Sequence, residues 1–306
     1  MSELLGDSVQ RSWHRFLDVY EPLRPDLYRY CRYLSRSPWD AEDLAQDTLA
    51  RAFVTLGCAA EAPANPRAWL FRVASNLWIN RAKRDREVPG DAPAADEAVT
   101  PEPRATREAA GTLLVRLSPQ ERAAVVLKDV FDLTLDEIAG TLGTSIGAIK
   151  AALHRGRGKL AAPEEEAAVA PVPAALDAFC DAFNARDLER LTALLLDTAT
   201  VEFPGLIVEH GAAAARAGSF RGTLLGCEVN DRRLGLVGPP RCEVRFHRGE
   251  PLLLWWWGGE VRSIVRATVD GDRIATMHNY FHAPELLAEV CRELGVPFRT
   301  NGHHYW

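Results

Sequence analysis

Residues 117–160 read LSPQERAAVVLKDVFDLTLDEIAGTLGTSIGAIKAALHRGRGKL, and the start and stop signals of three helices lie in this stretch. Two capping boxes, each a hydroxyl residue followed three positions later by a glutamate, open the first two helices: Ser118 with Glu121, and Thr134 with Glu137. Gly143 ends the second helix, and a third helix is expected from residue 144 or 145 to about 160. Two short helices joined by a glycine turn make a helix-turn-helix, which places its last helix in the major groove of DNA.

The third helix of this stretch is predicted to have one buried side and one side suited to DNA. Apolar residues at helical spacing predict the buried stripe: Ile146, Ile149, Leu153 and Leu160. On the other side, small residues allow close approach to a duplex, and basic residues can reach base edges or phosphates. We predict these residues to face DNA: Thr144, Gly147, Lys150, Ala151, His154, Arg155 and Arg157. The alternative is a solvated basic end on a helical bundle.

Two further helices are predicted upstream. Residues 40–53 have helical periodicity, with an acidic and polar face that includes Asp43, Gln46 and Asp47. Residues 65–86 form the second helix, which carries apolar residues on two sides. It is therefore either sandwiched between other elements or keeps aromatic side chains for a ligand.

The distribution of charge qualifies the net charge of −6, which alone argues against a nucleic-acid partner. Residues 1–160 contain 22 basic and 22 acidic side chains, so residues 161–306 contain 14 basic and 20 acidic ones and the whole excess of negative charge. Residues 65–86 hold six basic side chains against Asp85 alone. Local basic patches therefore remain compatible with DNA binding.

Two stretches rich in proline and acidic residues divide the chain. They predict linkers at 88–108 and 161–173, between a helical domain at 1–87, a helix-turn-helix domain at 109–160 and a mixed domain at 174–306. Six well-separated cysteines form no CxxC pair, so neither a structural zinc nor a disulfide scaffold is predicted. No apolar run approaches the roughly 20 residues of a membrane span, so we expect a cytoplasmic protein with no membrane partner.

The third domain is predicted to be α+β. Two amphipathic helical segments at 174–184 and 188–196 come first, and a last helix is expected at 284–294. Strand-like runs lie between them at 199–203, 241–247, 252–257, 260–269 and 273–281. Helices followed by a meander of strands are typical of the α+β class.

The two helical blocks together resemble a known family. Residues 117–122, 135–139 and 147–157 resemble the promoter-recognising fourth domain of the extracytoplasmic-function sigma factors of bacterial RNA polymerase. Residues 40–49, DAEDLAQDTL, and 69–77, WLFRVASNL, resemble the polymerase-docking helix and the −10 element of their second domain. The two motifs in this order, separated by a linker, are highly specific.

The resemblance implies roles for individual residues. Three would dock on the polymerase clamp: Asp43, Gln46 and Asp47. Eight lie where the family opens and reads the −10 DNA, the aromatic ones by stacking on unpaired bases: Trp69, Phe71, Asn76, Trp78, Asn80, Arg81, Lys83 and Arg84. Among these residues, Trp69 is the one most expected to belong to the core instead. The helix-turn-helix residues named above would read the −35 element.

The third domain resembles the SnoaL-like domain, a cone-shaped α+β fold that serves both enzymes and non-catalytic regulators. The resemblance rests on residues 178–184, 191–195, 269–274, 278–282 and 294–302. Five residues can line its cavity: Glu202, Trp256, His278, Tyr280 and His282. They would permit acid and base chemistry on a small molecule, but we expect neither catalysis nor a cofactor there. We expect no metal either, because His278 and His282 lie at helical spacing on a strand-like run, where that spacing does not converge. Core packing is the default for Trp256.

These observations predict a non-catalytic sigma factor whose partners are the RNA polymerase core enzyme and promoter DNA. Its C-terminal domain is expected to regulate it through an intramolecular contact or a small-molecule ligand. Two alternatives remain open. One is a free-standing helix-turn-helix transcription regulator, and the other is a SnoaL-type enzyme fused to a DNA-binding module.

Overall fold

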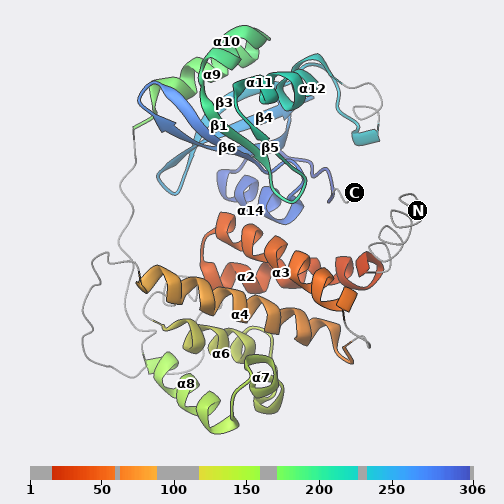
Figure 1. Ribbon diagram of the computed structural model, residues 1–306, viewed down its shortest axis with the longest axis vertical. Helices are drawn as coiled ribbons and strands as arrows, with labels where there is room; N and C mark the ends of the chain where they lie inside the picture. The colour runs from red at the N-terminus through yellow and green to blue at the C-terminus, as the bar shows by residue number, and fades with distance from the viewer. Residues whose placement is uncertain (1–15, 59–62, 88–116, 159–170, 227–232, 304–306) are drawn as a thin grey trace. The chain divides into compact units, whose positions relative to one another are not determined.

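The computed structural model describes residues 16–58, 63–87, 117–158, 171–226 and 233–303, and the chain divides into two compact units, Met1–Glu165 and Glu166–Trp306 (Figure 1). The predicted linker at 88–108 and most of that at 161–173 lie outside the described residues. Within the described ranges, no helix is both long enough and apolar enough to span a membrane.

The helices of the first unit are η1 (Glu21–Leu23), α2 (Arg24–Ser35), α3 (Pro38–Cys58), α4 (Pro66–Glu87), α6 (Pro119–Asp129), α7 (Leu135–Leu142) and α8 (Ile146–Gly158). The second unit contains α9 (Ala174–Asn184), α10 (Leu188–Ala193), β1 (Leu195–Phe203), β2 (Ile207–His210), α11 (Ala212–Ala215), the π-helical turn η3 (Arg216–Phe220), α12 (Arg221–Leu225), β3 (Arg241–His247), β4 (Glu250–Trp257), β5 (Glu260–Asp270), β6 (Arg273–Asn279) and α14 (Pro284–Leu294).

The first three long helices pack on one another. α2 contacts both α3 and α4, and fully buried leucines from all three helices, such as Leu27, Leu44 and Leu70, fill the core. A buried ion pair joins α2 to α3, because Arg24 Nη2 donates to Glu42 Oε1 where both side chains are almost wholly inaccessible. Gln46 Nε2 donates to the same carboxylate oxygen at 2.8 Å. Glu42 therefore faces inward although it lies in the acidic stretch of the sequence.

The helix-turn-helix forms as its capping signals predict. Both capping boxes are present, at Ser118 with Glu121 and at Thr134 with Glu137. Gly143 ends α7 in the left-handed conformation, with φ +62°, which glycine adopts without strain. The predicted buried stripe of α8 is wrong at Ile146, whose exposure of 37% reflects its place at the first position of the helix.

The second unit is built on a six-stranded sheet in the order β2-β1-β6-β5-β4-β3. Strands β3 to β6 form an antiparallel meander, whereas β1 pairs with β6 in parallel. The predicted fold class, helical domains followed by an α+β domain, is confirmed. The sequence reading missed β2 and the helices α11 and α12, and it extended the second helix to 196, where the chain has already entered β1.

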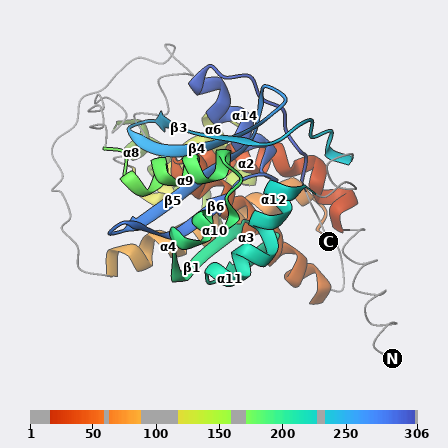
Figure 2. The same cartoon turned by 90° about the horizontal axis from the view of Figure 1, so that it is seen from above.

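The middle of the sheet is buried on both faces, since every residue of β4 from Leu252 to Trp257 is buried. Side chains from alternate positions, such as Leu253, Trp255 and Trp257, join α9 and α10 in one hydrophobic cluster. Figure 2 shows α9 and α10 over the sheet, and α14 contacts β5 and β3. Helix α14 lies on the opposite face. Cys242 and Val244 of β3 pack in the cluster, so His247, at an odd position of the same strand, points away from it, and His247 Nε2 lies 2.7 Å from Glu293 Oε2 of α14.

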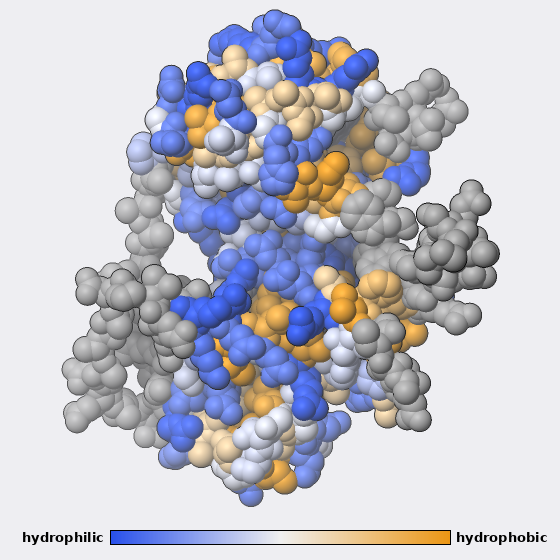
Figure 3. Space-filling view, viewed as in Figure 1, coloured by the Kyte–Doolittle hydropathy of each residue, from blue (hydrophilic) through white to orange (hydrophobic). Residues whose placement is uncertain are grey.

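The segment after α14 completes the sheet. Pro297 O accepts from Val261 N at 2.8 Å and Arg299 N donates to Val261 O at 3.1 Å, so the segment runs beside the start of β5. The buried guanidinium of Arg262 donates to Asn301 Oδ1 and to the carbonyl of Leu234, and thereby joins three distant segments. Hydrophilic residues predominate on the molecular face drawn in Figure 3, with hydrophobic ones interspersed.

Candidate functional site

The predicted docking face on α3 is polar and accessible in part. Asp47 is exposed, whereas Asp43 and Gln46 are half-buried. Gln46 is held by its hydrogen bond to Glu42, so the buried ion pair below it fixes the position of the amide. The helix therefore presents Asp47 and Asp43 to the surface and uses Glu42 to attach itself to α2.

α4 presents a polar stripe of side chains on one side. Asn65 Oδ1 caps the helix by accepting from Ala68 N at 3.0 Å, and Pro66 occupies the first helical position. The exposed side chains three or four residues apart are Arg72, Asn76, Asn80 and Lys83. Arg84 is exposed next to this stripe, Arg81 is half-buried, and Trp69 lies half-buried on the same side. The sequence reading missed Arg72, although its spacing to Asn76 could have indicated it.

The aromatic residues Phe71 and Trp78 lie on the opposite side of α4. Phe71 is buried, and its ring stacks on Tyr30 of α2 with centroids 4.6 Å apart. Phe131, just after α6, meets both rings edge-on, with centroids 5.8 Å from Tyr30 and 4.9 Å from Phe71. In this arrangement Phe71 contacts protein and has no face available to a nucleic-acid base.

Trp78 is covered from the helix-turn-helix as well. The guanidinium carbon of Arg122 in α6 lies 5.7 Å from the centroid of the Trp78 ring, and Arg122 Nη1 donates to the carbonyl of Leu34 at 2.5 Å. Burial, together with the nearby charge of Arg36, lowers the pKa of the Arg122 guanidinium to about 10. The helix-turn-helix thus packs on α2 and α4 through the aromatic side chain of Phe131 and the half-buried cation of Arg122.

The predicted DNA-facing residues of α8 separate into two groups. Gly147, Lys150 and His154 are exposed, and Thr144 and Ala151 are half-buried on the same side. A Cβ at Gly147 would meet only Ser145 Oγ, at 3.9 Å, so the helix surface is open there.

Arg155 and Arg157 form the second group, since both bind carboxylates of α6. Arg155 Nε donates to Glu121 Oε1 at 2.9 Å, and Glu121 uses its other oxygen in the capping box. Arg157 donates through two nitrogens to Asp129, and this hydrogen bonding raises the pKa of the guanidinium. Both arginines are more than half exposed, so they keep outer surfaces available for phosphates.

The five predicted cavity residues of the second unit do not share one environment. Glu202 and His278 are paired in the register of β1 and β6, and Glu202 Oε2 lies 3.4 Å from His278 Nε2. Trp256 and Tyr280 are buried, and His282 Nδ1 lies 3.3 Å from the carbonyl oxygen of Gly302.

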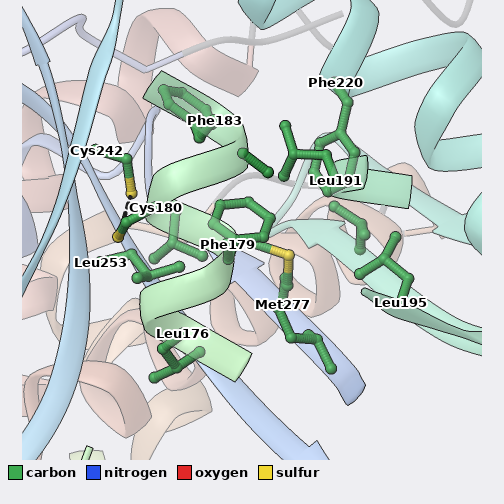
Figure 4. Packing of buried hydrophobic residues seen from close by; sticks show 14 of the residues in the cluster. Leu176, Phe179, Cys180, Phe183, Leu191, Leu195, Phe220, Cys242, Leu253 and Met277 are labelled. Carbon is green, nitrogen blue, oxygen red and sulfur yellow. Dashed lines mark hydrogen bonds between the residues drawn. The ribbon is translucent and has the colours of Figure 1, made fainter. Parts of the chain in front are cut away.

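Alternation along β1 and β6 directs Glu202 and His278 away from the hydrophobic cluster of Figure 4. Met277 points into that cluster, so the adjacent His278 is directed to the other face of the sheet. Glu202 follows the cluster residue Val201 in the same way. Among the described residues, no group of three or more His, Cys, Asp or Glu side chains has the arrangement of a metal site.

Two family models match the two helical segments of the chain. The family model for Sigma-70 region 2 matches residues 19–88, and that for Sigma-70 region 4 matches residues 107–160. The ECF RNA polymerase sigma factor SigM of Mycobacterium tuberculosis is 30% identical over 165 residues, which are 52% of this chain and 82% of SigM. This chain belongs to the ECF sigma factors. SigL of the same organism is 32% identical and is covered over 81% of its length, against 44% of this chain.

Other relatives of this ECF sigma factor extend further along the chain. SigG of Mycobacterium tuberculosis is 32% identical over 223 residues, and the match spans 60% of both chains, so this chain covers less than two thirds of SigG. The crystal structure of SigJ from Mycobacterium tuberculosis overlaps 86% of this chain and 95% of its own, with 21% identity and a TM-score of 0.33. A putative ketosteroid isomerase from Kribbella flavida overlaps 35% of this chain and 74% of its own, with 16% identity and a TM-score of 0.26.

Proposed function

We propose that this chain acts as a promoter-specificity subunit, which binds core RNA polymerase and directs it to a −35 and a −10 element. The observation that carries the proposal is the pair of accessible polar surfaces on α4 and α8, each within a segment that a sigma region model matches. Region 2 contributes the stripe of Arg72, Asn76, Asn80 and Lys83, and region 4 contributes the exposed side of α8.

The docking face on α3 would bind a basic surface of the polymerase. Reversal of one exposed charge on this face, Asp47→Arg, is expected to weaken binding to core polymerase at least about tenfold, because opposite charges would be replaced by like ones. Asp181→Arg is the matched control, since Asp181 is an exposed aspartate on α9, outside region 2. Equal affinities of the two variants for core polymerase would contradict the docking role.

The −35 surface is tested at Lys150. Lys150→Ala should lower the affinity of the reconstituted holoenzyme for its promoter by about 5- to 150-fold, the worth of one base contact at 1–3 kcal/mol. Arg221→Ala is the control, since Arg221 is an exposed basic residue on α12. The measurement is promoter binding and single-round transcription with purified core polymerase. Identical behaviour of the two variants would place DNA recognition elsewhere.

The same assay separates a sigma factor from a free-standing regulator. A sigma factor requires core polymerase to protect its promoter in a footprint, whereas a free-standing regulator protects an operator without polymerase. Protection of the same DNA by the chain alone, at the same concentration and salt, would refute the proposed function.

For the second unit we propose a regulatory role without catalysis. Its excess of acidic residues and its position after region 4 support a unit that modulates the helical one. A protease site inserted after Glu165 allows the full chain to be purified and then cut. Cleavage is expected to change promoter output or polymerase affinity. Unchanged values of both, with the secondary structure retained, would refute regulation.

A further inference from the structure

Two cysteines that lie far apart in the sequence face each other in the second unit. Cys180 lies on α9 and Cys242 on β3, and their sulfur atoms are 3.3 Å apart (Figure 4). Both are unoxidised thiols, and both are buried, with exposures of 8% for Cys180 and 2% for Cys242. A disulfide has a sulfur–sulfur distance of about 2.0 Å, so a shift of roughly 1.3 Å would bring the two atoms to bonding distance.

The surrounding structure fixes the two sulfurs in this relation. Asn184, one helical turn after Cys180, donates from Nδ2 to Cys242 O at 2.9 Å and accepts from Cys242 N at 2.8 Å. The amide of Asn184 therefore attaches the end of α9 to the backbone of the cysteine on β3. Phe183 and Trp255, with ring centroids 4.8 Å apart, pack between the same two layers and limit sliding of the helix over the sheet.

We propose that Cys180 and Cys242 form an intramolecular disulfide bond when the protein meets a hydroperoxide, so that this pair is an oxidative modification site of the second unit. Cys180, the more accessible of the two, attacks a peroxide oxygen; the O–O bond breaks, and a sulfenic acid and one molecule of water form from hydrogen peroxide. Cys242 then attacks the Cys180 sulfur, the S–O bond breaks, and the oxygen leaves as a second molecule of water. The two thiols are oxidised by two electrons, and the peroxide is reduced by two.

The burial of the pair sets the rate of this reaction. Burial is the main cause that raises the pKa of the Cys242 thiol well above its ordinary value, and the adjacent Cys180 raises it further. Because the thiolate is the nucleophile, the second step, in which Cys242 attacks the Cys180 sulfur, should be slow at neutral pH and should accelerate as the pH rises. The bond would form under sustained oxidation and would persist, because the packed layers hold the sulfurs together.

The experiment uses the full chain, first reduced and then exposed to hydrogen peroxide. Free thiols are blocked, and tryptic peptides are analysed by mass spectrometry. The expected product is one linked peptide pair that contains Cys180 and Cys242, lost again on treatment with dithiothreitol. Persistence of both as free thiols after prolonged oxidation, or linkage of either to another cysteine in the native monomer, would overturn the proposal.

Thermal stability gives a second readout that does not depend on peptide recovery. A disulfide that closes the long loop between α9 and β3 should raise the melting temperature of the second unit by roughly 5–15 °C. Cys180→Ala and Cys242→Ala should abolish this increase. Cys291→Ala, the loss of a buried cysteine of α14 in the same unit, should retain it. A melting temperature that is unchanged or lowered in the oxidised wild type overturns the proposal even if a single variant fails to fold.

Discussion

Removal of the Glu42 carboxylate should destabilise region 2 strongly, although Glu42 lies in a stretch of acidic residues that otherwise belong to the surface. Its side chain is 0% exposed and that of Arg24 is 4% exposed. The substitution Glu42→Leu leaves the guanidinium of Arg24 buried opposite an apolar group. A buried charge that loses its partner costs about 3–5 kcal/mol, which is a large share of a typical unfolding free energy of roughly 5–15 kcal/mol.

A double substitution separates the cost of breaking the ion pair from the worth of the pair. In Arg24→Met with Glu42→Leu, no charge stays buried at this position, and apolar residues of similar length fill the space. The double variant should therefore recover most of the loss and lie within roughly 1–2 kcal/mol of the wild type. Glu42→Leu alone should raise the unfolding equilibrium constant by about 150- to 5000-fold.

The assay is urea unfolding of the full chain, followed by hydrogen exchange in peptides from α2 and α3. This readout reports region 2 separately from the second unit. Asp47→Leu is the matched control, because Asp47 is exposed on the same helix and its removal should alter the unfolding free energy by less than about 0.5 kcal/mol. A cost below about 1 kcal/mol for Glu42→Leu, or a double variant as unstable as the single one, would refute this reasoning.

Two further predictions concern the second unit. Gly218→Ala should lower the unfolding free energy of this unit by about 1–3 kcal/mol, because a Cβ there would overlap the buried Glu209 carboxylate. The control is Gly222→Ala, where a Cβ would have nothing within 4 Å, and it should be neutral or slightly stabilising in thermal melts. Burial acts to raise the pKa of the Glu293 carboxyl, but hydrogen bonds from Arg248 and His247 lower it below its ordinary value. Glu293 therefore stabilises the folded state above the unfolded pKa of about 4.3, so the difference in melting temperature between wild type and Glu293→Gln should shrink as pH falls below that value; a difference that grows on acidification would contradict it.

Local signals predicted the helix-turn-helix well, because its boundaries depend on neighbouring residues. The two capping boxes and Gly143 satisfy backbone groups within four residues, so their effect is visible in the sequence itself. The element type of β3 to β6 was predictable for a similar reason, since runs of β-branched and aromatic residues favour strands. Strand β2 was missed because only four residues form it and only one of them is buried.

The burial and the ion pairs of the candidate site residues depend on contacts between distant helices, which the periodicity of the sequence does not reveal. Phe71 was predicted as a base-stacking residue, and its burial under Phe131 depends on how α6 packs against α4. Arg155 and Arg157 were predicted as DNA ligands, yet their carboxylate partners lie 34 and 28 residues earlier in α6. Exposure along α4 could be predicted only for residues whose spacing matched one polar stripe, such as Asn76 and Asn80.

The parallel pairing of β1 with β6 has a consequence for the order in which the chain folds. Val201 pairs with Met277, so the middle of the sheet cannot close until nearly the whole second unit has been synthesised. Region 2 depends on contacts between helices that are neighbours in the sequence, such as α2 with α3 and α3 with α4, and should fold faster for that reason. A newly made chain therefore presents its region 2 helices before its acidic unit exists as a folded body, and the rate of sheet closure sets how long that interval lasts.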